Sequence, residues 1–382
     1  MGIFFLTIIY FVSERFFDLV EIYTSHSDLV LLTTIMIIPL SIGILFNKNF
    51  YSSNKNLIKF FIYCFVGSII TASINFSQSF SAGFSASRVF LTYCFLMITL
   101  YKFAPLIKPF KLFNFVSFVS LFLVVINFYI YSTGNYSFYY GNVLDRFEDI
   151  RFLIGGTSII YFYLYLISFK DVKATAIPIS ILLLLVVAIV AKTRSLLFPL
   201  LFITIIHFVD LSRFKNLLQI IFSILFISFL SIFLRDTTIW TSLYDLYELS
   251  INDIEEGGGN ITFRLFTLIY FFENMTPLSW IFGYGMEIDK LALYDERFYL
   301  SDVGMFKIFY YHGIVGLYLF FSLLYEIYKE SRKNNSPFHV FARYLIYFQF
   351  LSPTLTILYT PTGIFIFLLT FFKIRQINES NI

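Results

Sequence analysis

Cysteine, histidine and charged residues are scarce in this sequence. Its 382 residues include two cysteines and four histidines, and only 13% are charged. Cys64 and Cys94 lie inside apolar stretches, so neither a disulfide framework nor a thiolate metal site is indicated. The sequence also lacks the H-E-x-x-H, D-x-D, P-loop and G-x-S-x-G motifs. It therefore gives no support to metal-dependent hydrolysis, nucleotide-sugar binding or serine acyl transfer.

Apolar residues dominate what is present. They make up 58% of the chain, aromatic residues alone make up 22%, and the mean hydropathy is +0.80. Such a composition is typical of a polytopic membrane protein. Because a span needs about 17–25 apolar residues, we predict an all-α bundle of about 12 transmembrane helices in one membrane domain, residues 1–382. The apolar runs fall at 2–13, 29–46, 60–76, 89–107, 112–132, 153–169, 176–191, 196–209, 217–234, 304–328, 343–358 and 361–373.

Lysine-bearing loops alternate along the chain with loops that are poor in lysine. Since short loops rich in lysine remain in the cytoplasm, this alternation predicts that both termini are cytoplasmic. The lysine-poor segments then face outward, and the longest of them is a partly helical external loop late in the chain. The outward segments are 14–28, 77–88, 133–152, 192–195 and 235–303.

Arginine is distributed in the opposite way to lysine. On this topology the inward segments hold twelve Lys and four Arg, whereas the outward segments hold two Lys and eight Arg. A guanidinium group binds phosphate or carboxylate through two parallel hydrogen bonds, and an ammonium group is a point charge. The outward arginines therefore favour a phosphate-bearing ligand at that face. They are Arg15, Arg88, Arg146, Arg151, Arg194, Arg235, Arg264 and Arg297.

Ordinary surface ion pairs are the alternative explanation for these arginines. Each such pair contributes little to stability, and the outward segments hold enough carboxylates to form them. The candidate partners are Glu148, Asp149, Glu255, Glu256, Asp295 and Glu296.

Three residues late in the chain carry further expectations. Arg264 opens an apolar helical stretch, where a charge at membrane depth needs a partner or a function. Asp302 precedes the helix 304–328 and is a candidate general base, with N-capping or pairing to Lys307 as its alternative roles. His312 is expected to be a hydrogen-bonded histidine inside the bundle.

The order of these features resembles the Wzy-type polymerases of O-antigen and capsule repeat units, within the superfamily that includes the O-antigen ligases. The resemblance spans most of the chain and consists of about 12 helices, a long external loop late in the sequence, and three short patterns. These patterns are "TFR" at 262–264, "PLSWIFGYG" at 277–285, and "SDVGMFKIFYYHGIVGLY" at 301–318.

The resemblance implies a glycosyltransferase of the bacterial cytoplasmic membrane. Its expected substrates are oligosaccharides linked to polyprenyl diphosphate, with no metal, other cofactor or nucleic acid. A chain-length regulator and a flippase are the expected protein partners. Arginines of the external loops are expected to hold the diphosphate: Arg194 and Arg264 first, then Arg88 and Arg151. Where the ligases carry a catalytic histidine this chain has Ser301-Asp302, so Asp302 is the first candidate base, followed by Glu148 and Asp149.

Two other functions remain open at this stage. A flippase or secondary transporter of lipid-linked oligosaccharide would show related halves and polar groups near mid-membrane, and the sequence shows no internal repeat. An O-antigen ligase would carry the expected histidine. Both are less well supported than a polymerase.

Overall fold

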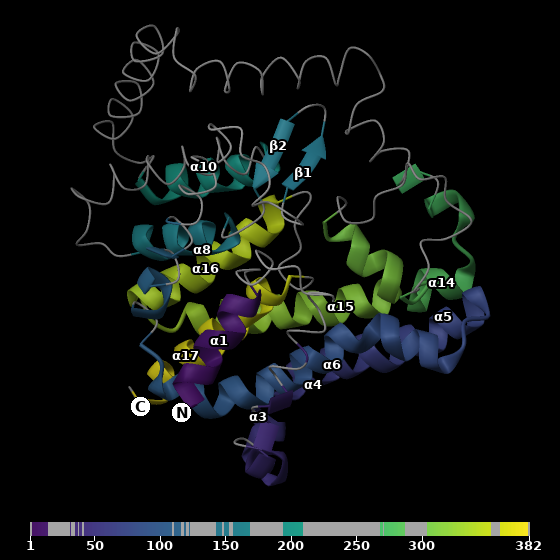
Figure 1. Cartoon of the computed structure of the whole chain (residues 1–382), viewed down its shortest axis with the longest axis horizontal. Helices are drawn as coiled ribbons and strands as arrows, with labels where there is room; N and C mark the ends of the chain where they lie inside the picture. The colour runs from purple at the N-terminus through teal and green to yellow at the C-terminus, as the bar shows by residue number, and fades with distance from the viewer. Residues whose placement is uncertain are drawn as a thin grey trace, which may run out of the picture.

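The computed structural model describes sixteen stretches of the chain. They are residues 2–13, 31, 35–36, 38–39, 42–108, 111–115, 118–119, 122, 143–146, 149–152, 156–168, 194–208, 268–269, 271–286, 304–352 and 360–380. Apart from one pair of short strands, the regular structure in these stretches is helical, as the all-α prediction requires (Figure 1).

Most of the longer helices coincide with predicted apolar runs, whereas α3, α14 and the two strands lie between them. The helices are α1 (Gly2–Ser13), η2 (Ile42–Phe46), α3 (Lys48–Ser53), α4 (Lys55–Ile62), the π-helical turn η3 (Tyr63–Gly67), α5 (Ser68–Phe76), α6 (Phe80–Phe103), η4 (Ala104–Leu106), α8 (Gly156–Ile167), α10 (Arg194–Phe208), α14 (Pro277–Phe282), α15 (Phe306–Ser331), α16 (Pro337–Leu351) and α17 (Pro361–Ser380). The strands are β1 (Val143–Arg146) and β2 (Asp149–Phe152), which pair antiparallel.

Three of the described helical segments are long and apolar enough to cross a membrane. They are Lys55–Phe76, Phe80–Leu106 and Phe306–Ser331. The chain thus has the character of a membrane protein. The other predicted spans and the full extent of the external loop stay predictions.

The first helical hairpin corrects one predicted boundary. Residues 77–88 were expected to form an outward loop, but α6 already begins at Phe80. The connection consists only of 77–79, because Ser77 adopts a left-handed conformation (φ 51°) and the hydroxyl of Ser79 caps α6 by accepting from the Ala82 N–H. Arg88 therefore lies inside a helix and not in a loop.

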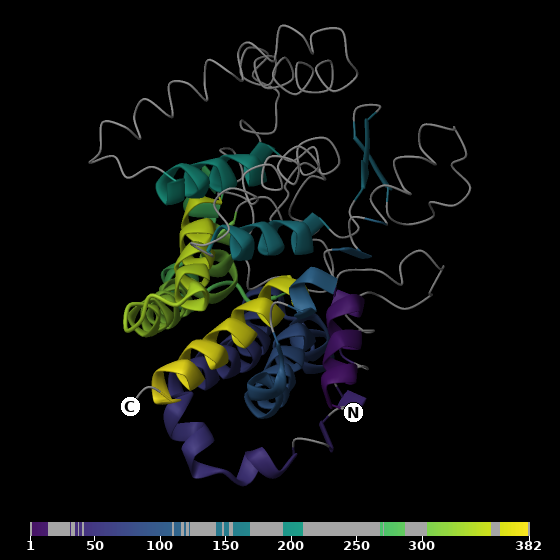
Figure 2. The same ribbon diagram turned by 90° about the vertical axis from the view of Figure 1, so that its left-hand side faces the viewer.

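Helix α17 forms the centre of the bundle. It packs against α1, α6, α8, α15 and α16, and thirteen of its residues are buried. A helix that is apolar on all sides is stable only when it is surrounded, and this position provides that environment. Figure 2 shows α17 between α16 and α1, and the N- and C-termini lie at the same end of the bundle in Figure 1.

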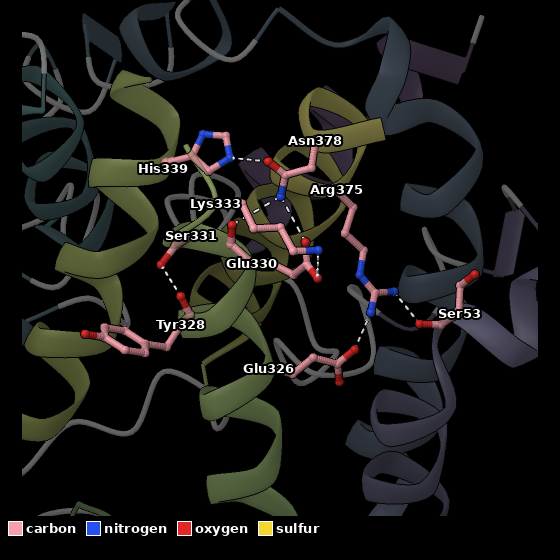
Figure 3. A network of polar contacts seen from close by, with 9 residues as sticks. All are labelled: Ser53, Glu326, Tyr328, Glu330, Ser331, Lys333, His339, Arg375 and Asn378. Atoms are coloured by element: carbon pink, nitrogen blue, oxygen red, sulfur yellow. Dashed lines mark hydrogen bonds and ion pairs between the residues drawn. The ribbon is translucent and has the colours of Figure 1, made fainter. Parts of the chain in front are cut away.

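A polar network ties the end of α15 to α17, α16 and α3 (Figure 3). Arg375 of α17 forms an ion pair with Glu326 of α15 and donates to the carbonyl of Ser53. Asn378 of α17 donates to the Glu330 carboxylate at 2.9 Å, and its own oxygen lies 2.9 Å from Nε2 of His339. Since each partner comes from a different helix, the network fixes how these helices converge.

Burial lowers the pKa of His339 below its usual value, against a smaller raising effect of the hydrogen bond to Asn378. The residue lies in the first turn of α16, before the predicted span 343–358. Its Nδ1 lies 2.7 Å from the Ser336 hydroxyl, so both ring nitrogens have partners while the ring is neutral. The folded state thus favours the neutral imidazole.

We expect acid to destabilise this end of the bundle. A lowered folded pKa means that the stabilisation from neutral His339 is present above the unfolded pKa of about 6.5 and is lost as the pH falls through the folded pKa. The thermal unfolding midpoint in detergent should therefore fall between about pH 7 and pH 5. A His339→Gln variant should show a smaller fall, and an equal fall in both proteins would contradict the assignment.

Candidate functional site

The turn after α14 is held by the end of the first hairpin. Asn75 of α5 donates to the carbonyls of Gly283 (3.3 Å) and Tyr284 (3.2 Å), and Gln78 donates to the carbonyl of Met286 (3.1 Å). The ring of Tyr284 stacks on Tyr310 of α15, with centroids 4.9 Å apart. Segments about 200 residues apart in the sequence are thus joined by side-chain amides that satisfy the carbonyls of the turn.

Helix α15 is kinked where this turn meets it. Gly313 has φ 64° and ψ −165°, which breaks the helical hydrogen-bond pattern. The carbonyls just before the kink are used by the turn: the Tyr284 N–H donates to Tyr310 (2.8 Å) and the Gly285 N–H donates to Tyr311 (3.0 Å). The kink is therefore part of the contact, since it presents two carbonyls that a regular helix would have used internally.

Three glycines allow close approach around the turn: Gly283 and Gly313 where the turn meets α15, and Gly285 where it meets α5. We call these contacts the α14–α15 joint. All three have positive φ. A Cβ at Gly283 would lie 2.3 Å from the Tyr311 carbonyl, and a Cβ at Gly313 would lie 2.3 Å from the carbonyl oxygen of Ile281. A side chain at Gly283 or Gly313 would push the turn and α15 apart, and one at Gly285 would push the turn away from α5.

The π-helical turn η3 faces the kink from the other side. The Tyr63 hydroxyl donates to the carbonyl of His312 at 2.9 Å, and the Ser68 hydroxyl lies 3.1 Å from Nδ1 of His312. The ring of Phe90 from α6 packs edge-on against His312, with centroids 5.2 Å apart. His312 is 1% exposed. The prediction of a hydrogen-bonded bundle histidine is confirmed, and the side chain is fully buried.

Arg88 is the predicted diphosphate ligand whose side chain the structure describes. It is half-buried in α6, eight residues after Phe80, or about 12 Å along the helix axis. Its guanidinium lies 3.5 Å from the Ser85 hydroxyl, and its carbonyl accepts from Thr92 (3.2 Å). A cation at this depth in an apolar span is costly unless it has a function or a partner.

The structure describes the backbone of some of the remaining predicted site residues and not of others. Arg194 is the first residue of α10. Asp149 and Arg151 lie on β2, where Asp149 is the register partner of Arg146 and Arg151 that of Leu144. Glu148, Arg264 and Asp302 lie outside the described residues.

The predicted capping role of Asp302 is wrong. Helix α15 begins at Phe306 and its N-cap position is Met305, so Asp302 lies three residues before the cap. Lys307 lies over the ring of Tyr311 at 5.9 Å from the centroid, and its predicted pairing with Asp302 stays a prediction. Within the described residues, no group of three or more His, Cys, Asp or Glu side chains could hold a metal ion.

Several structurally important residues of this region were not singled out from the sequence. Asn75 and Gln78 look like ordinary polar residues near a helix end, and nothing in the local pattern marks the π-helical turn at 63–67. The signal that was available is the pair of glycine patterns, G-x-G at 283–285 and G-x-x-G at 313–316, each weak alone. The two patterns contact one another, which only the fold reveals.

Comparison with known proteins identifies no relative: neither a protein-family model nor a curated protein sequence matches the chain.

Substitution of Gly285 should destabilise the joint. Its φ is 84°, and a Cβ there would lie 2.3 Å from the Ala72 amide nitrogen and 2.5 Å from the Ser68 carbonyl. We expect Gly285→Ala to lower the free energy of unfolding by about 2–4 kcal/mol, from left-handed strain and overpacking together. Thermal unfolding in detergent measures this loss.

Gly43→Ala is the matched control, because nothing lies within 4 Å of a Cβ at that position. If both variants unfold at the same temperature, the close approach at Gly285 contributes no stability.

Proposed function

We propose that this protein polymerises oligosaccharide repeat units linked to polyprenyl diphosphate, by glycosyl transfer at the outer face of the cytoplasmic membrane. The observation that carries the proposal is the half-buried Arg88 inside the apolar span Phe80–Leu106. On the predicted topology Arg88 lies in the outward half of that span, where the diphosphate of a lipid-linked donor would be.

The chemistry needs a cation at this depth. The hydroxyl of the acceptor's terminal sugar attacks the anomeric carbon of the donor chain, and the bond from that carbon to the diphosphate oxygen breaks. The proton of the hydroxyl passes to a carboxylate, for which Asp302 is the first candidate, followed by Glu148 and Asp149. Polyprenyl diphosphate leaves with the electron pair, and guanidinium groups stabilise the negative charge that develops on it.

The α14–α15 joint supports the same proposal in a different way. Two of the three short patterns on which the family resemblance is based, "PLSWIFGYG" and the glycine-containing helix after it, pack directly on one another. The joint also connects α14, which lies in the predicted external loop, to two of the candidate spans.

Deletion of the gene in the native host should separate the candidate functions. Loss of a polymerase leaves a single repeat unit on its acceptor, loss of a ligase leaves the acceptor bare, and loss of a flippase traps repeat units on the cytoplasmic face. We expect the first outcome on gel analysis of the surface glycan. Unchanged chain length, in a host without a second polymerase, would refute the proposal.

Replacing the diphosphate-binding arginines by lysine tests the role of the guanidinium group. Arg88→Lys and Arg194→Lys keep the charge but lose the two-pronged hydrogen bonding, so we expect each to shorten the glycan and reduce polymerisation at least about tenfold. Glycan length distribution after complementation of the deletion strain is the measurement.

The exposed Arg332, the C-cap residue of α15, is the control position. Arg332→Lys should complement fully. If Arg88→Lys gives glycan of normal length at an equal protein level, the guanidinium of Arg88 is not needed for polymerisation. The same result for Arg194→Lys would exclude that role for Arg194.

A further inference from the structure

An apolar groove runs along the exposed side of the first candidate span, Lys55–Phe76. It has a volume of about 720 Å³, and we call it the α4–α5 groove. Its walls come from the segment Lys55–Phe76, from α14 and from α15. The residues that decide its character are Ile62, Val66, Ile70, Ile74, Leu278 and Phe282, each 40–59% exposed.

The dimensions of the groove match an extended hydrocarbon chain. It extends from Ile58 to Ile74, sixteen residues of helix or about 24 Å, close to the thickness of a bilayer's hydrocarbon core. Its lining is apolar except for Lys59, Tyr63 and Thr71, and the hydroxyls of Tyr63 and Thr71 donate to backbone carbonyls. Beyond Lys59, the lining offers no free polar group to a sugar or a phosphate.

Charge is present at only one end of the groove lining. Lys59 lies there, exposed, and among the described residues no carboxylate is within ion-pair distance of it. At the opposite end, the amides of Asn75 and Gln78 donate to carbonyls of the 283–286 turn instead of facing a ligand. A lipid in the groove would therefore have its anionic headgroup beside Lys59.

This asymmetry selects the kind of lipid. The predicted topology places Lys59 on the cytoplasmic side, where anionic phospholipid headgroups attract lysines near the membrane surface. A donor on polyprenyl diphosphate would need its cation at the outward end, near Ile74. We propose that the α4–α5 groove is a binding site for one anionic phospholipid, with an acyl chain along Ile62, Val66, Ile70 and Ile74 and its phosphate at Lys59.

The site can be tested by tryptophan quenching in the full-length protein. Trp240 and Trp280 are replaced by Phe, and one tryptophan is introduced at Val66, in the groove, or at Phe84 of α6. Phe84 is the control because it is similarly exposed, does not line the groove, and lies beside Phe65 at 5.6 Å between ring centroids. Each protein is reconstituted in phosphatidylcholine vesicles with brominated phosphatidylglycerol or brominated phosphatidylcholine.

The Val66→Trp probe should prefer brominated phosphatidylglycerol roughly fivefold, the effect of one lysine at the membrane surface. The Phe84→Trp probe should show almost no preference. Adding Lys59→Gln should abolish the preference at position 66, whereas Lys55→Gln, one turn earlier and outside the groove, should leave it unchanged.

Three results would overturn the proposal. Equal preference at positions 66 and 84 would mean ordinary contact with bulk lipid. A preference that persists in Lys59→Gln would remove the headgroup contact. Displacement of brominated lipid at position 66 by polyprenyl phosphate, and not by phosphatidylglycerol, would make the groove a site for the glycan carrier. If Val66→Trp does not fold, Ile70→Trp probes the same groove.

Discussion

Close contact between the 283–285 turn and α15 organises the packing of α5, α14 and α15 around it. The contact requires main-chain atoms to approach within distances that any side chain would prevent, and Gly283 and Gly313 meet that requirement. Gly285 allows the same close approach of the turn to α5. The kink at Gly313 then exposes carbonyls to the turn, and Tyr63 donates to the carbonyl of His312 beside it. The 283–285 turn, the kink at Gly313 and the π-helical turn η3 thus supply hydrogen-bond partners for one another's backbone groups. An apolar environment requires such partners.

The joint also determines what surrounds it. Because the turn is fixed to α15, Asn75 and Gln78 can hold it to the first hairpin, and α14 is placed so that Leu278 and Phe282 form one wall of the α4–α5 groove. At the other end of α15, Glu326 and Arg375 fix the helix to α17. One network is built on backbone carbonyls and the other on charged side chains.

Local hydropathy predicted most helices but misplaced the start of α6. The stretch before Arg88 contains Gly83 and Ser87, which lower its mean hydropathy and suggested a loop. Both residues are buried, and a Cβ at Gly83 would lie 3.4 Å from the Cα of Ile69. Small residues at the contact between two membrane helices allow close packing. A hydropathy scale scores Gly and Ser as polar, so it underestimates the tendency of such a segment to form a membrane helix. The candidate site changed accordingly, because Arg88 moved from a loop into a span.

The sequence by itself determined the membrane character of the chain, its mainly helical structure and the opposite distributions of lysine and arginine. These properties depend on composition and on spacing within a few residues, which a linear pattern contains. The tertiary structure decided that the two glycine patterns meet, that His312 is shielded, and that Lys59 lies at one end of an apolar groove. Each of these depends on contacts between residues that are far apart in the chain, such as Ser68 and His312, and packing alone brings such residues together.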